Sequence, residues 1–118
     1  MPTDNPQEKT LGLVAHLLGA FTGWLGPLIL WLVKKEQGGF AVQEARTALN
    51  FQITVFAAYI AVVIVTIVVG FISVTLAGLV SLLYLLIWLG GLVFSIINAL
   101  KANKGEDGKY PYSLNLIK

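Results

Sequence analysis

Apolar residues fill two long stretches of the chain, 10–33 and 47–100, and every charged residue lies outside them. A helix rises about 1.5 Å per residue, so the first stretch can cross a hydrocarbon core of about 30 Å once. The second stretch is too long for one crossing and too short for three. Gly70 and Gly78, with Ser73 between them, mark a turn near its middle.

The pattern therefore predicts an all-α, polytopic integral membrane protein with three transmembrane helices. The chain is expected to form a single membrane domain, 1–118, with spans at about 10–33, 48–72 and 77–101. A short interfacial tail, 102–118, follows, because Pro111 argues against a continuing helix there.

Within the first span, small residues recur at helical spacing on one face. Such a face lets two helix backbones approach closely in lipid, so we expect it to contact another helix, in this chain or in a second copy. Gly26-Pro27 interrupts the same span, and the proline predicts a kink there. The expected helix-contact face consists of Gly12, Ala15, His16, Gly19 and Gly23.

The second helix is expected to begin after Gly38-Gly39, with an amphipathic first part on the cytoplasmic side. At 100° per residue, Asn50 and Thr54 share one polar face, and Gln52 points almost opposite. Asn50 is therefore expected to face inward, and Gln52 to meet a different neighbour or the headgroup region.

The third span repeats this arrangement, because Asn98 and Ser95 lie at depths that match Asn50 and Thr54. The two asparagines are expected to be coupled by hydrogen bonding. One interpretation is that the polar residues only fix the register of the helices, and the other is a ligand or permeation site. The expected polar and packing cluster comprises Asn50, Thr54, Ser95, Asn98, Gly23, Gly26 and Pro27.

Composition supports a membrane protein: 57% of the residues are hydrophobic and 12% are charged, against about 25% charged in soluble domains. With three spans, seven of the eight Lys and Arg residues fall on the side of the 34–46 loop and the tail. The positive-inside rule then places the C-terminus in the cytoplasm and the N-terminus outside, in a bacterial-type inner membrane. A cleaved signal peptide is the competing interpretation of the first segment, but its basic flank follows the apolar run and the run is longer than a typical signal-peptide core.

Few residues suggest chemistry. The chain has no cysteine, and its one histidine, His16, has no second metal-binding residue close to it in sequence. Glu44 and the other acidic residues are interpreted as solvated loop charges, and Tyr110 and Tyr112 as membrane-interface anchors. We therefore expect no catalytic residue, no cofactor and no metal site, and nothing indicates nucleic-acid binding.

Two functions fit these features. The first is a non-catalytic membrane scaffold or accessory subunit that contacts the lipid bilayer and binds protein partners or forms a homo-oligomer. The alternative is a transport, channel or protein-translocation component that uses the polar stripes as a lining.

Four segments carry a family resemblance: GPLILWLVKKE (26–36), ALNFQIT (48–54), GLVFSIINALKANKGE (91–106) and YPYSLNLIK (110–118). They resemble a small bacterial membrane-protein family of unknown function that is grouped with the chloroplast inner-envelope import component of about twenty kilodaltons. The recognisable marks are Asn50, Phe51 and Gln52, and the Tyr110-Pro111 pair. The resemblance implies a multi-helix inner-membrane protein and no established activity.

Overall fold

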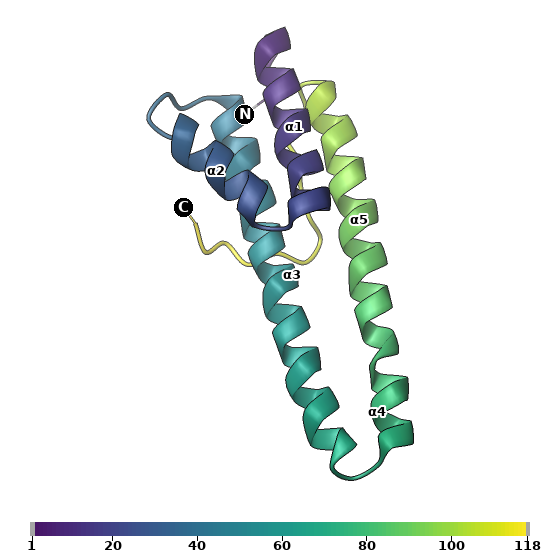
Figure 1. Ribbon diagram of the computed structural model, residues 1–118. Coiled ribbons are helices and arrows are strands. Elements are labelled where there is room, and N and C mark those ends of the chain that lie inside the picture. The colour runs from purple at the N-terminus through teal and green to yellow at the C-terminus, as the bar shows by residue number, and fades with distance from the viewer. Residues whose placement is uncertain (1, 118) are drawn as a thin grey trace.

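In the computed structural model, which describes residues 2–117, the chain forms five helices and, over those residues, no strand. The molecule is elongated, with extents of 55 × 23 × 19 Å. A long hairpin forms its frame: α3 (Phe40–Gly70) runs one way, and α4 (Val74–Val80) and α5 (Leu82–Asn103) run back (Figure 1). Two shorter helices, α1 (Pro6–Thr22) and α2 (Leu25–Lys34), lie against one half of this hairpin.

The long hairpin contains the two helical segments that could cross a membrane. α3 begins at Phe40, as predicted, because Gly39 has a φ of 96°, which residues with a side chain rarely adopt. After the far turn, the Ser73 hydroxyl accepts the N–H of Leu76 and so caps α4. By length and composition, Phe40–Gly70 and Val74–Asn103 are each sufficient to span a membrane.

The half of the hairpin farther from α1 and α2, residues 53–94, is named the apolar shaft here. It exposes large apolar side chains in many directions, among them Ile60, Ile64, Ile67, Val68, Leu79, Leu82, Leu85 and Leu86. Exposed apolar surface of this extent is unfavourable in water and fits a hydrocarbon environment. The shaft is therefore in contact with lipid.

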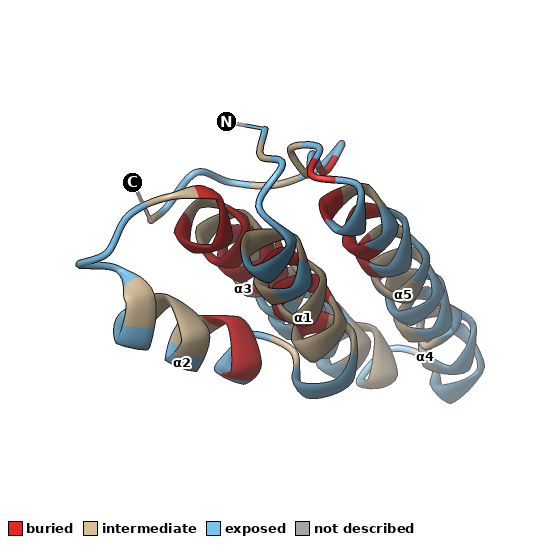
Figure 2. Ribbon diagram, turned by 90° about the horizontal axis from the view of Figure 1, so that it is seen from above, coloured by how far each residue is buried: buried red, intermediate tan, exposed pale blue. Residues whose placement is uncertain are grey.

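Most of the buried residues gather in the other half, named the head: residues 2–52, which contain α1, α2, the α2–α3 loop and the first part of α3, the last part of α5 (95–103) and the tail (104–117). Figure 2 shows the buried positions on the start of α3 and on the inner faces of α1 and α5. α1 lies between α3 and α5, and Gly12 makes this close approach possible. A Cβ on Gly12 would lie 2.8 Å from Phe40 Cε2 and 3.1 Å from Ala102 Cβ.

Residues 10–33 form two helices and not one kinked span. α1 ends at Thr22, Gly23 takes a φ of 69°, and α2 begins at Leu25 and turns back (Figure 1). The predicted kink at Gly26-Pro27 is wrong, because Pro27 lies in the first turn of α2, where no helical hydrogen bond needs its N–H. The Thr22 hydroxyl links the two helices: it donates to the Leu18 carbonyl at 2.6 Å and accepts the Gly26 N–H at 2.8 Å.

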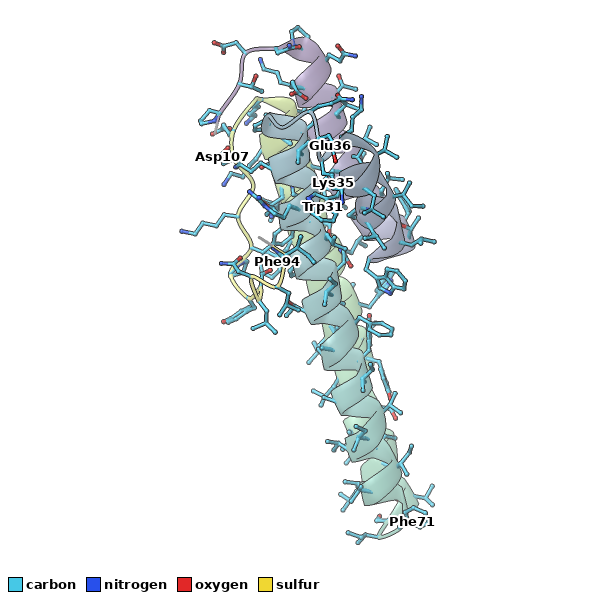
Figure 3. The ribbon with its side chains drawn as sticks, turned by 90° about the vertical axis from the view of Figure 1, so that its left-hand side faces the viewer. Trp31, Lys35, Glu36, Phe71, Phe94 and Asp107 are labelled. Atoms are coloured by element: carbon cyan, nitrogen blue, oxygen red, sulfur yellow. The ribbon has the colours of Figure 1, made fainter. Side chains whose placement is uncertain are left out.

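The N-terminal segment lies beside the C-terminal end of α5. The Thr3 N–H donates to the Gly105 carbonyl oxygen at 2.9 Å. In Figure 3, Lys35, Glu36 and Asp107 lie toward one end of the molecule and Phe71 at the other. The expectation that the N-terminus faces the opposite side from the 34–46 loop and the tail is therefore not supported.

Candidate functional site

His16 of α1 is the centre of a buried polar network in the head. Its side chain is fully buried, with Nε2 2.9 Å from Glu44 Oε1 and Nδ1 2.6 Å from the Tyr110 hydroxyl. Glu44 comes from α3 and Tyr110 from the tail, so the imidazole joins three segments that are distant in sequence. The small residues of α1 allow the ring to reach both partners, because they bring the helix backbone close to its neighbours.

Glu44 is a fully buried carboxylate and not the solvated loop charge expected from the sequence. Its Oε1 accepts from the Gly108 N–H at 2.8 Å as well as contacting His16, whereas Oε2 has no partner in the described part of the chain. Burying an ionised group is unfavourable unless hydrogen bonds compensate. Glu44 lies in the first turns of α3. It is buried because α1 and the tail cover this face of the helix.

Tyr110 is buried, with 7% of its surface exposed, so its predicted role as an interface anchor is wrong. Its ring stacks on Phe51 at 4.0 Å between centroids with an interplanar angle of 14°. Burial raises the pKa of the Tyr110 hydroxyl well above its ordinary value, and the nearby Glu44 charge raises it further, while a hydrogen bond with Ser95 lowers it. The hydroxyl therefore stays protonated and able to donate. Tyr112 is exposed, and its role at the membrane interface stays a prediction.

The two contacts of His16 determine how its protons are arranged. A carboxylate only accepts, so Nε2 carries a hydrogen and donates to Glu44. In the neutral imidazole, Nδ1 then accepts from the Tyr110 hydroxyl. When the ring is protonated, Nδ1 donates to the Tyr110 hydroxyl oxygen instead. Either form leaves both ring nitrogens with a partner.

Ser95 and Gln52 extend the network toward the apolar shaft. The Gln52 side-chain amide donates to the Ser95 hydroxyl at 3.1 Å, and both residues are buried. Gln52 also lies against Gly19 of α1, where an added Cβ would be 3.1 Å from Gln52 Nε2. Gln52 thus contacts α1 on one side and α5 on the other, and not the neighbours of Asn50.

The two asparagines hold the tail and do not bond each other, which corrects the expected coupling. Asn98 accepts the Lys109 N–H at 2.6 Å and donates to the Phe94 carbonyl of its own helix at 2.9 Å. Asn50 donates to the Ile117 carbonyl at 3.0 Å and accepts the Ile117 N–H at 2.7 Å. One turn deeper, the Thr54 hydroxyl accepts the Leu114 N–H at 2.9 Å. Side chains thus provide the hydrogen bonds that an extended segment lacks outside a sheet.

The comparison with protein-family models identifies the chain. The model of the magnetosome magnetite crystal formation protein family (MamF/MmsF) matches residues 7–117. The chain belongs to this family. Neither the comparison with curated proteins nor that with solved structures gave a match. A small bacterial membrane-protein family is thereby supported, whereas the grouping with the chloroplast import component receives no support.

In this magnetosome-family chain, the residues of the expected polar cluster belong to separate contacts. Ser95 bonds Gln52, while Asn50, Asn98 and Thr54 bond the tail. Gly26 and Pro27 are buried in the first turn of α2. On α1, Gly12, Ala15, His16 and Gly19 are buried, but Gly23 terminates the helix and an added Cβ there would meet nothing within 4 Å. Gly23 is therefore not part of the helix-contact face.

The geometry of the network suits a structural role, in which it holds the tail in place against the helices. His16 and Glu44 are enclosed by protein, and Tyr110, although buried, lines a cavity at the surface. Over the described residues, no group of three or more His, Cys, Asp or Glu side chains is placed to hold a metal ion. The magnetosome family is not known to be enzymatic. The network clamps the tail of this family member to its helices.

Sequence reasoning missed Glu44 and assigned Tyr110 a different role. A signal for Glu44 was present, because Glu44, Ala48 and Gln52 follow one another at four-residue intervals, the spacing of one helix face. Ala41 and Ala45 also precede the apolar run, which is typical of a helix start that is already covered by protein. For Tyr110 no comparable signal exists, since the tail has no helical period.

Proposed function

We propose that the chain is a non-catalytic membrane scaffold that presents a rigid head at the surface of the membrane on which magnetite crystals form. The observation that carries this proposal is the division of the molecule into an apolar shaft and a head whose tail is held by Glu44, His16, Asn98 and Asn50. The family match supports the place of action.

A single membrane domain with two spans is the topology that fits the fold. α3 and the α4–α5 segment cross the membrane, and the α1–α2 hairpin enters from the head side and returns to it. Thr22 satisfies backbone groups at the tip of this hairpin, as non-helical backbone at membrane depth requires. Three spans with the N-terminus outside is the competing topology.

The head is assigned to the cytoplasmic side by its charge. All the Lys and Arg residues of the described part lie in segments of the head: Lys9, Lys34, Lys35, Arg46, Lys101, Lys104 and Lys109. The positive-inside rule places such a segment in the cytoplasm. The 71–73 turn then faces the opposite side, which is the lumen when the membrane encloses a vesicle.

Protein partners are expected to bind the solvated surface of the head. The α2–α3 loop exposes Glu36 and Gln37, and Lys35 lies over the Trp31 ring at 5.3 Å, so charged and aromatic groups are both available there. The rigid tail adds a second exposed segment next to it. A scaffold of this kind recruits partners without changing them chemically.

One observation favours the competing transport function. A cavity of about 220 Å³ lies at the tip of α1 and is lined in part by Gln52, Tyr59 and Trp88. Farther along α3, however, the Thr66 hydroxyl donates to the Val62 carbonyl of its own helix at 2.7 Å. The polar lining therefore does not continue through the shaft, and the scaffold is preferred.

The proposal is tested in the organism that carries the gene. We expect deletion to alter the size or number of magnetite crystals in electron micrographs, and the wild-type gene to restore them. A Glu36→Ala, Gln37→Ala variant should insert normally, recover fewer cross-linked partners than wild type and fail to restore the crystals. A Thr75→Ala variant, at an exposed position next to the opposite turn, is the control. Crystals unchanged by deletion would refute the role in crystal formation, and full rescue by the loop variant would refute recruitment through the loop.

A further inference from the structure

A polar groove runs between α3 and the extended tail, on the side of α3 that carries Asn50. Two adjoining cavities of about 280 Å³ and 480 Å³ form it, and both are lined by Thr47, Asn50 and Asn115. Asn50 bonds Ile117, and the Thr47 hydroxyl donates to the Gln43 carbonyl of its own helix at 2.9 Å. Among the described residues, the side chains of Arg46 and Lys109 take part in neither the buried network nor the tail clamp.

The groove is built for an anion. Arg46 lines the larger cavity and Lys109 the smaller one, with the Gln43 and Asn115 side-chain amides as further donors. Neither lining contains an Asp or Glu from the described residues. The ion pair found among those residues joins His16 to Glu44, so Arg46 has no carboxylate partner there. A guanidinium and an ammonium with amide donors between them match the oxygens of a phosphate group.

The groove also lies at the boundary between the head and the apolar shaft. Arg46 is two turns before Ile53, where the uninterrupted apolar surface of α3 begins. Along the tail, Tyr112, Leu114 and Leu116 are exposed, whereas Ser113 and Ile117 are half-buried. The same segment thus lines the groove with Ser113, Asn115 and Ile117 and exposes the large side chains of Tyr112, Leu114 and Leu116.

From this placement we propose that the groove binds the headgroup of an anionic phospholipid, with the phosphate between Arg46 and Lys109 and the acyl chains along Leu114 and Leu116. A free phosphate would use the two cations and leave the exposed leucines in contact with water. A lipid uses both. Basic pockets on the cytoplasmic side of a helical membrane protein are suited to such headgroups.

The test is native mass spectrometry of the full chain in detergent with added dioleoyl phosphatidylglycerol or dioleoyl phosphatidylcholine. We expect wild type to bind phosphatidylglycerol in preference to phosphatidylcholine. Arg46→Gln and Lys109→Gln should each weaken phosphatidylglycerol binding by about tenfold, because each removes a charge-assisted contact. Lys34→Gln and Lys104→Gln, which remove the same charge from the head outside the groove, are the matched controls. Arg46→Lys keeps the charge, so it should bind phosphatidylglycerol more tightly than Arg46→Gln and nearly as tightly as wild type.

Each alternative outcome refutes the lipid site. Equal binding of the two lipids would show that the headgroup charge is not recognised, and equal losses in the control variants would reduce the effect to overall charge. Displacement of phosphatidylglycerol by inorganic phosphate alone would identify the groove as a site for free anions. The thermal melting temperature of each variant is measured in parallel, and a variant counts only if it melts as wild type does. If neither glutamine variant does, Arg46→Met and Lys109→Met, which remove the charge and keep an apolar stem, replace them and are expected to lose the preference for phosphatidylglycerol.

Discussion

His16 and Tyr110 lie 94 positions apart in the chain, and His16 Nδ1 is 2.6 Å from the Tyr110 hydroxyl. The contact ties the tail to α1, and the second nitrogen of the same ring ties α1 to Glu44 on α3. The long hairpin, the short hairpin and the tail therefore form one unit. A scaffold that must present a defined surface requires such rigidity.

The pair of His16 and Glu44 is expected to contribute strongly to stability. His16→Ala leaves a buried carboxylate with only the Gly108 N–H, so we expect a loss of about 3–5 kcal/mol in reversible unfolding from detergent micelles. Adding Glu44→Ala to this variant should cost less than the two single losses together, because the second change removes the uncompensated charge. Glu36→Ala, at an exposed loop position, is the control and should change little. Additive losses would show that the two side chains do not interact.

Tyr110 is expected to make the protein sensitive to alkaline pH. The pKa of its hydroxyl is raised in the folded state, so its contribution is fully present below the ordinary value of 10.0 and is lost as the pH rises above that value. Tyr110→Phe keeps the stacking on Phe51 and removes the titrating group. We expect it to cost about 1–3 kcal/mol at neutral pH and to reduce the loss of stability above pH 10. Identical pH profiles for wild type and variant would contradict the burial of the hydroxyl.

The two asparagines should protect different parts of the tail. Asn98→Ala is expected to increase amide hydrogen exchange around Lys109, and Asn50→Ala around Ile117, because each removes the acceptor of that N–H. Exchange measured by mass spectrometry on peptides from the tail distinguishes the two. Asn103→Ala, at the exposed end of α5, serves as the control. Parallel increases over the whole tail in both variants would mean that the tail detaches as one segment.

Replacing either of two helical glycines, Gly12 and Gly90, with alanine should have opposite effects on stability. Gly12→Ala is expected to destabilise, since its Cβ would lie 2.8 Å from Phe40 Cε2. Gly90→Ala meets nothing within 4 Å and should be neutral or stabilise by about 0.5–1 kcal/mol through helix propensity. Melting temperatures of the two variants in the same detergent test the close approach of α1. Equal effects would show that α1 does not lie against α3 at Gly12.

Single-cysteine labelling decides between two and three spans, because the natural chain has no cysteine. With two spans, and with the chain expressed in the cytoplasmic membrane, Thr3→Cys and Gln37→Cys are both shielded from an impermeant thiol reagent in intact cells, and Ser73→Cys is labelled. With three spans, Thr3→Cys is labelled while Gln37→Cys stays shielded. Labelling after the cells are lysed confirms that every site reacts. Labelling of Gln37→Cys in intact cells would reverse the assigned orientation.

The amino-acid sequence by itself determined the class of the protein and the longest elements. The absence of charge over residues 47–100 requires a hydrocarbon environment, and the Gly38-Gly39 pair marks the start of α3 because glycine readily adopts positive φ. Helical periodicity also separated Asn50 from Gln52 correctly, since the faces of a helix follow from spacing alone.

Only the tertiary structure decided what covers each face. A charge such as Glu44 at the water-exposed end of a helix is normally solvated, and its burial depends on His16 and on Gly108, which is 64 positions away. The turn at Gly23 forms if the free energy is lower with α2 packed against α3 than with α2 as a continuation of α1. No local sequence pattern determines this difference. Tyr110 became buried because Phe51 and His16 offered a stacking surface and a hydrogen-bond partner together. Contacts between distant segments are set by the total free energy of the folded chain, so helical spacing predicts the faces but not their partners.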